Sequence, residues 1–187
     1  MTYYGGKELA AAFRTVRNNT IQIAEEIPEN KYDTRGCSDT RTVAQLLTHI
    51  ALGPRFQLYT QRDKVTDLKT VNFQALMQEV MAEEAKPRTK AEIVAFLKSE
   101  GERFATFVES LPESFLSESV TMPPGASPAT KTRFEMLLSP KEHEMHHRGQ
   151  LMLIQRQLGL VPHLTRQMQE RMAQMAQAAA GQGAAAR

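Results

Sequence analysis

This chain of 187 residues has a single cysteine, a small net charge and no long apolar run. Cys37 is the one cysteine, so no disulfide can form within the chain, and this agrees with a reducing compartment. The 23 basic and 21 acidic residues leave a formal net charge of only +2, and no basic stripe alternates with aromatic residues. We therefore expect no specific binding to nucleic acid, because such binding requires a concentrated positive surface.

No apolar run approaches the length of a membrane-spanning helix, and the opening MTYYGGKELAAAF contains none of signal-peptide length. We expect a soluble cytoplasmic protein that does not associate with a membrane. The apolar share of 41% is that of a globular chain, and the length suits one domain with a sizeable core.

Strand signals and internal repeats are nearly absent, whereas apolar residues recur at helical spacing along most of the chain. The long segments with this pattern are residues 7–27, 40–52, 90–111 and 139–158. The start signals of the last three are Thr40 or Asp39, then Thr89 with Glu92, then Ser139 with Pro140 and Glu142. Four amphipathic helices predict an all-α protein built as a four-helix bundle.

The remaining segments are shorter or irregular. Residues 71–84 predict a short amphipathic helix, and residues 113–131 predict an irregular connection in which only FLSESVT could be extended. We expect a bundle domain over residues 1–165, followed over residues 166–187 by a C-terminal helix and a disordered Ala/Gly-rich tail. One side of this extra helix is expected to carry Met168, Met172 and Met175.

Three of the five histidines lie in the stretch KEHEMHHRGQL, residues 141–151. On a helix, His143 and His147 are one turn apart and about 40° apart around the axis, and the same line leads to Leu151 and Ile154. Both imidazoles should therefore face the bundle core, where their nitrogens can converge on one metal ion about 2.0–2.1 Å away. The alternative is a pair of buried histidines satisfied by hydrogen bonds. We favour the metal, because such a pair on an apolar stripe is the usual helical metal clamp.

His49, in the stretch RTVAQLLTHIA, is the candidate third ligand. It lies one turn after Leu46 and is flanked by Leu47 and Ile50, so His49 should point toward the core or its edge, and a bundle can bring it opposite the first pair. Considered alone, His49 would instead be a buried histidine bonded to a backbone carbonyl. His146 lies about 60° to the other side of His143, and His163 is expected to be a surface or capping residue.

The same stretch contains His143-Glu144-x-x-His147, which matches the HExxH signature of zinc proteases. Such a protease needs Glu144 as a general base and a third ligand further along the chain. Gln150 and Leu153 occupy the positions where a metzincin has glycine and histidine. Glu144 lies about 100° round the helix from His143, and we expect it to face solvent or to bond to a ligand. A zinc metalloprotease is therefore the less favoured alternative.

The stretch RTVAQLLTHIA, followed after a long interval by KEHEMHHRGQL and LGLVPHLTR, resembles the DinB/YfiT-like family, named for damage-inducible members. The resemblance covers residues 5–165 and depends on one histidine in the second helix and a His-x-x-x-His in the fourth, followed by Arg-Gly-Gln. It implies a four-helix bundle, a stress-related role and a homodimer. It also implies that His49, His143 and His147, but not His146, bind a divalent metal ion, most often zinc or nickel.

Three neutral imidazoles would leave the charge of the ion uncancelled and coordination positions open, which is typical of catalytic sites. Characterised members of the family include thiol-dependent S-transferases, so the resemblance implies an enzyme that activates a low-molecular-weight thiol, or else water, against a small electrophilic substrate. His146, Arg148 and Gln150 are candidate contacts to a ligand or an anionic substrate, with a solvated arginine and a packing glutamine as the alternatives. The alternative function is a non-catalytic, stress-related metal-binding bundle, whose metal would be closed off by a fourth protein ligand.

Overall fold

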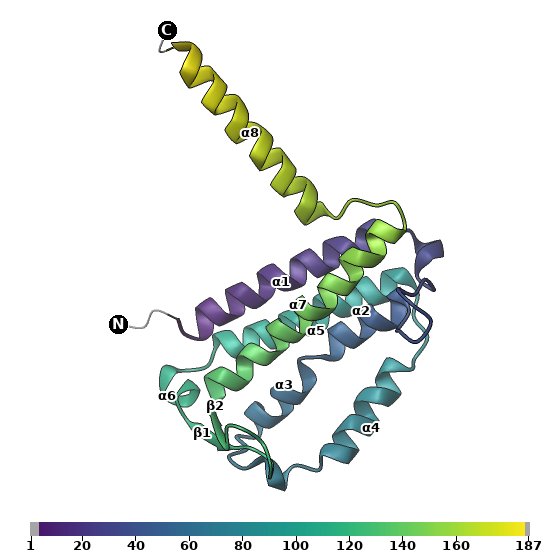
Figure 1. The fold of residues 1–187 in the computed structure, drawn as a ribbon. Coiled ribbons are helices and arrows are strands. Elements are labelled where there is room, and N and C mark those ends of the chain that lie inside the picture. The colour runs from purple at the N-terminus through teal and green to yellow at the C-terminus, as the bar shows by residue number, and fades with distance from the viewer. Residues whose placement is uncertain (1–3, 186–187) are drawn as a thin grey trace.

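Four helices pack side by side into a bundle in the computed structural model, which describes residues 4–185 and the side chains of residues 4–179 (Figure 1). The bundle helices are α1 (Gly6–Glu26), α2 (Val43–Leu52), α5 (Lys90–Glu109) and α7 (Arg133–Gln157). α1 packs against α5 and α7, and α2 packs against the same two helices. The predicted all-α four-helix bundle is confirmed.

The apolar faces of these helices meet in the core at the predicted positions. Phe13 of α1 and Phe104 of α5 are buried, and their rings meet edge to face with centroids 4.8 Å apart. Leu97 of α5 packs in a neighbouring cluster with Leu151 and Ile154 of α7. Each fully buried large apolar side chain stabilises the fold by about 1.5–3 kcal/mol. The core therefore fixes the rotation of each helix, and with it the direction of the polar side chains.

The start of α2 differs from the prediction, which placed the cap at Thr40 or Asp39. Thr42 is the cap: its hydroxyl accepts from the backbone N–H of Gln45, and its own N–H donates to the Gln45 side chain. Thr40 instead donates its hydroxyl to the carbonyl of Cys37 within the preceding loop. The helix ends at Leu52, where the predicted segment 40–52 also ends.

The start of α7 was also predicted wrongly. Thr132 caps the helix in a reciprocal pair with Glu135, so α7 begins at Arg133 and Pro140 lies in its interior. Proline costs a helix one backbone hydrogen bond in this position and is therefore usually interpreted as a start signal. The sequence Thr132-Arg-Phe-Glu135 has the same capping-box pattern as residues 139–142 and was the signal that identifies the true start.

Shorter elements connect the bundle helices. The predicted short amphipathic helix is α4 (Phe73–Glu84), which lies beside α2 and has no fully buried residue. The stretch FLSESVT was expected to be extended, and its last three residues form β1 (Ser119–Thr121). This strand pairs antiparallel with β2 (Thr130–Thr132). No helix in the described part of the chain is long and apolar enough to cross a membrane. The other short elements are η1 (Glu29–Lys31), α3 (Arg55–Arg62), η2 (Leu68–Thr70) and α6 (Glu113–Leu116).

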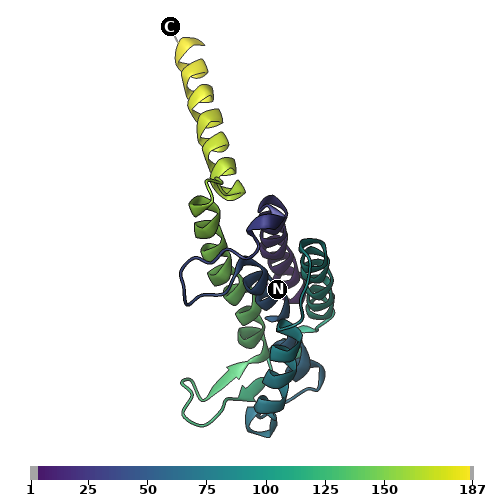
Figure 2. The same ribbon diagram turned by 90° about the vertical axis from the view of Figure 1, so that its right-hand side faces the viewer.

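Helix α8 (His163–Ala185) extends away from the bundle in both views (Figures 1 and 2). Its methionines Met168, Met172 and Met175 are all exposed. The prediction that His163 is a surface or capping residue was wrong, because its side chain is buried and its Nε2 lies 3.2 Å from Oδ1 of Asn19 on α1. The backbone of the Ala/Gly-rich tail continues α8 as far as Ala185, and the predicted disorder of this tail is untested and stays a prediction.

Candidate metal centre

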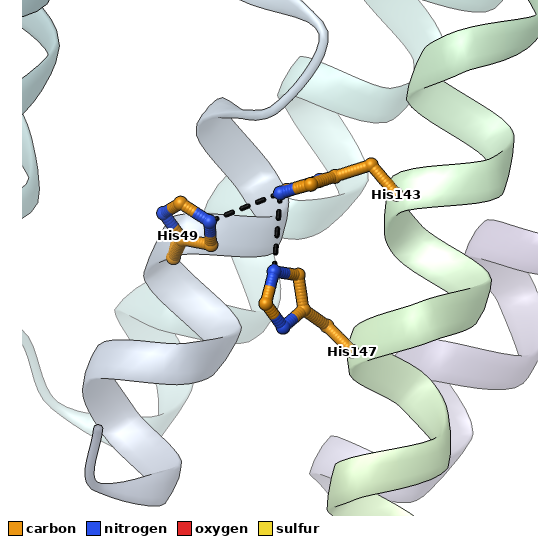
Figure 3. Close-up of side chains that lie close together, drawn as sticks. All are labelled: His49, His143 and His147. Carbon is orange, nitrogen blue, oxygen red and sulfur yellow. Dashed lines mark hydrogen bonds between the residues drawn. The ribbon is translucent and has the colours of Figure 1, made fainter. Parts of the chain in front are cut away.

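Three histidines from two helices of the bundle converge on one point (Figure 3). His49 extends from α2, whereas His143 and His147 extend from successive turns of α7. The Nε2 atom of His143 lies 3.0 Å from that of His49 and 3.1 Å from that of His147. All three side chains are half-buried. We call this group the histidine triad, and it brings together the three residues predicted as ligands.

The local structure explains why the rings meet. His143 and His147 continue the stripe of α7 that carries the buried Leu151 and Ile154, so the core packing directs them toward α2. Gly53 follows α2 directly, and a Cβ at that position would lie 2.9 Å from Nδ1 of His143. The φ of Gly53 is −47°, which any residue adopts, so its role is to leave space for the His143 ring.

Hydrogen bonds at the outer ring nitrogens set the tautomers of two triad members. Nδ1 of His49 lies 3.1 Å from Oε2 of Glu84, and Nδ1 of His147 lies 2.8 Å from Oε1 of Gln150. Both oxygens are acceptors, so each Nδ1 carries the proton and each Nε2 presents a lone pair. Two lone pairs therefore point at Nε2 of His143, which has at most one proton to donate.

A cation at the point of convergence would satisfy all three nitrogens. Ligand nitrogens at about 2.0–2.1 Å from one ion are separated by about 2.8–3.4 Å for angles between 90° and 109°. The separations of 3.0 and 3.1 Å fit this range. Burial and the neighbouring imidazoles lower the pKa of His143 to about 4, and burial also lowers the pKa of His147. Both are therefore neutral at pH 7, which is the form that binds a divalent metal.

Glu84, at the end of α4, is a functional residue that the sequence did not reveal. Its carboxylate accepts from Nδ1 of His49 and, at 2.8 Å, from Nε of Arg41. Partial burial alone would raise the pKa of Glu84, but the hydrogen bonds from Arg41 and His49 lower it. Carboxylates in this position orient a ligating histidine and increase its basicity.

Replacing Glu84 by glutamine is expected to weaken binding of Zn²⁺ by about ten- to a hundredfold, the usual effect of losing a residue that orients a histidine ligand. The affinity can be measured by competition with a chromophoric chelator. Glu79→Gln is the matched control, because Glu79 is an exposed acid on the same helix and belongs to no metal-ligand group. Equal affinities for the two variants would show that His49 does not depend on Glu84.

Glu144 does not face solvent, so that expectation was wrong. It is 1% exposed, and both of its oxygens accept from Nε of Arg17 on α1 at 3.0 Å. The same arginine donates to the carbonyls of Leu97 and Ile50, at 2.8 and 3.2 Å. Burial raises the pKa of Glu144 while Arg17 opposes the shift. The carboxylate that a zinc protease would use as general base is therefore buried in the bundle and paired with Arg17.

The three residues predicted as further contacts lie at different depths. His146 is exposed, and its ring centroid lies 4.8 Å from that of His147. Gln150 bonds to His147 and has its Nε2 3.4 Å from Nε2 of His146. Arg148 is half-buried and interacts with the buried Glu144. Of the three, Gln150 alone touches a member of the triad through a hydrogen bond in the described part of the chain.

Two cavities of different chemistry flank the triad. The large cavity, of about 730 Å³, reaches His147, and the small cavity, of about 200 Å³, reaches His49 and His143. The polar and charged lining of the large cavity includes Arg35, Asp39, Arg41, Gln45, Glu84 and Gln150. The apolar lining of the small cavity includes Leu52, Phe56, Met77, Val80 and Pro140. The exposed thiol of Cys37 also lines the large cavity.

The fold matches those of several solved structures. YfiT from Bacillus subtilis, described as a probable metal-dependent hydrolase with an unusual four-helix bundle topology, is 15% identical with a TM-score of 0.64, and the match covers 86% of this chain and 91% of YfiT. A DinB-like protein from the same organism, YjoA, is 19% identical with a TM-score of 0.59, over 81% of this chain and 92% of YjoA. A Streptococcus pneumoniae protein is 21% identical with a TM-score of 0.56, over 86% and 94%.

The sequence itself also matches a family. No curated protein matches the chain. The family model of the DinB superfamily matches residues 12–151, a range that contains all three members of the histidine triad and the four bundle helices almost completely. The resemblance found in the sequence is confirmed, and the chain belongs to the DinB superfamily.

Proposed function

We propose that this chain is a metal-dependent enzyme in which His49, His143 and His147 hold a divalent ion, zinc or nickel, and a low-molecular-weight thiol reacts with a small electrophile. The observation that carries the proposal is that members of the triad line two cavities, His147 the large one and His49 and His143 the small one. A structural metal site is instead closed by a fourth protein ligand. In the described part of the chain, no fourth histidine, cysteine or acid joins the three.

The residues around the triad would prepare it for this role. A divalent ion, when bound, supplies the acidity that deprotonates a coordinating thiol or lowers the pKa of a coordinated water to about 7. Glu84 and Gln150 hold the outer protons of His49 and His147 and so keep both Nε2 lone pairs directed inward.

The large cavity is the proposed binding site of the thiol. Its volume of about 730 Å³ lies in the usual range of about 300–1,000 Å³ for small-molecule sites. Charges of both signs line it, among them Arg35 and Asp39, which suits an amino-acid or short-peptide thiol with charges of both signs. In the transfer, the thiol loses its proton and its sulfur bonds to an electrophilic carbon. The leaving group, such as chloride, departs with the bonding electron pair.

Hydrolysis is the second candidate function, because YfiT is described as a probable metal-dependent hydrolase. Water would then replace the thiol as the nucleophile: it loses a proton to solvent, its oxygen bonds to the electrophilic centre, and the leaving group departs with the bonding electron pair. The same triad would serve both reactions, so the nucleophile must be identified by experiment.

Zinc- or nickel-loaded protein is expected to accelerate the reaction of glutathione with 1-chloro-2,4-dinitrobenzene at least about a hundredfold over the metal-free protein, equivalent to about 2.7 kcal/mol in barrier. The absorbance of the thioether product measures the rate, and hydrolysis of 4-nitrophenyl acetate without thiol tests the second candidate. Metal-loaded protein that accelerates neither reaction would contradict the proposal and favour the non-catalytic metal-binding bundle.

A further inference from the structure

The small cavity lies where three helices meet beside the triad. Leu52 from the end of α2, Phe56 from α3 and Pro140 from the interior of α7 form its floor and sides, and His49 and His143 line it as well. The other side chains that line it are apolar, except for those of Gln57 and Ser139. A ligand in this cavity would therefore gain free energy mainly from apolar burial, with the imidazoles and two neutral polar side chains as its polar partners.

Helix α4 borders the small cavity, and contacts with the bundle hold it at both of its ends. At one end, the Phe73 ring meets the Phe56 ring edge to face, with centroids 5.9 Å apart. At the other end, Glu84 bonds to His49 and Arg41. The two residues of α4 that line the cavity between these ends are Met77 and Val80, and both are half-buried.

The size of the cavity limits what can bind. An apolar cavity of about 150 Å³ in a protein binds benzene, so a volume of about 200 Å³ admits one six-membered ring with one or two small substituents. The other cavity is larger and carries charges of both signs. The two cavities would thus accept molecules of different polarity beside different members of the triad.

We infer that the small cavity binds the carbon skeleton of the electrophilic substrate, and that this skeleton is an uncharged group the size of a single aromatic ring, with its reacting end toward His49 and His143. The inference rests on the proposed function, in which the thiol binds in the large cavity and reacts with the substrate held in the small one. Binding in the cavity can nevertheless be measured without turnover.

Methyl-labelled methionine makes this cavity visible by NMR, because Met77 lines it. Nitrobenzene, which has the required size and no leaving group, is expected to shift the Met77 methyl signal saturably. The signals of Met168, Met172 and Met175 on α8 should stay unchanged, since that helix extends away from the bundle. Met77→Leu assigns the signal. The absence of a saturable Met77 shift in the wild-type protein would overturn the inference.

Filling the cavity provides the second arm of the test. Val80→Trp is expected to weaken nitrobenzene binding at least about tenfold, or about 1.4 kcal/mol, while zinc binding stays unchanged. Met81→Trp is the matched control, because Met81 is the next residue on α4 and is 63% exposed. If nitrobenzene binding in Val80→Trp equals that in Met81→Trp, the ligand binds elsewhere and the inference fails.

The outcome separates this inference from the proposed function. Saturable binding in the cavity without any thiol transfer would leave the inference standing and refute the proposed transferase. Thiol transfer to 4-nitrobenzyl chloride, a single ring with two small substituents, with an unchanged KM in Val80→Trp would support the transferase and refute the cavity as its substrate site.

Discussion

His143→Ala is expected to remove nearly all zinc from the protein, from about one ion per chain to less than about a tenth after dialysis. Loss of a residue that only orients a ligand costs about ten- to a hundredfold in metal affinity, and loss of a ligand should cost more. His143 contributes the Nε2 atom that contacts both other triad nitrogens, at 3.0 and 3.1 Å. His49→Ala and His147→Ala should each have a similar effect. Elemental analysis of the dialysed proteins measures the metal content.

His146→Ala is the matched control for these variants. His146 is an exposed histidine on the same helix, and it does not belong to the group of converging ligand atoms. Its removal should leave most of the bound zinc in place. Equal metal loss in this variant would contradict the assignment of His49, His143 and His147 as the ligands.

Glu144→Gln is expected to lower the free energy of unfolding by about 3–5 kcal/mol, because it leaves the charge of Arg17 buried without its partner. The two side chains are 3% and 1% exposed, so solvent does not screen the loss. A chain of this length loses roughly 2–4 °C in Tm for each kcal/mol, so the midpoint should fall by roughly 6–20 °C. Thermal and urea unfolding followed by circular dichroism measure both quantities.

Glu142→Gln provides the control for the charge change, because Glu142 is exposed on the same helix and such surface changes usually stay within about 0.5 kcal/mol. The double variant Arg17→Met/Glu144→Met should recover much of the stability, since apolar side chains can replace a buried ion pair. At temperatures where Glu144→Gln is folded, it should still bind zinc at the triad. A stable Glu144→Gln protein would refute the structural role of the pair.

The fold and the triad could be predicted because their determinants are local in the sequence. Helical spacing placed His143 and His147 on one stripe with buried apolar residues, and the same reasoning placed His49 near the core. Glu84 could not be found in this way, because its contact with His49 depends on how α4 docks beside α2. No pattern within α4 specifies that docking, since none of its residues is fully buried.

The prediction that Glu144 faces solvent was wrong because it assumed that α7 has a single buried side. α7 packs against both α1 and α2, so it has two. Glu144 lies seven residues after Leu137 and seven before Leu151, and both leucines are completely buried. Seven residues are almost two full turns, so this spacing was the signal for burial. Arg17 stands at helical spacing from the buried Phe13, so it lies on the buried face of α1.

Cys37 has a practical consequence for any assay with an electrophile. It is the single thiol of the chain, it is exposed, and it lines the large cavity together with His147. A chloroaromatic reagent can arylate such a thiol once per chain, which would appear as a stoichiometric burst of absorbance rather than as repeated cycles. Kinetics in a Cys37→Ser background, or after the burst has ended, therefore report only the reaction of the added thiol.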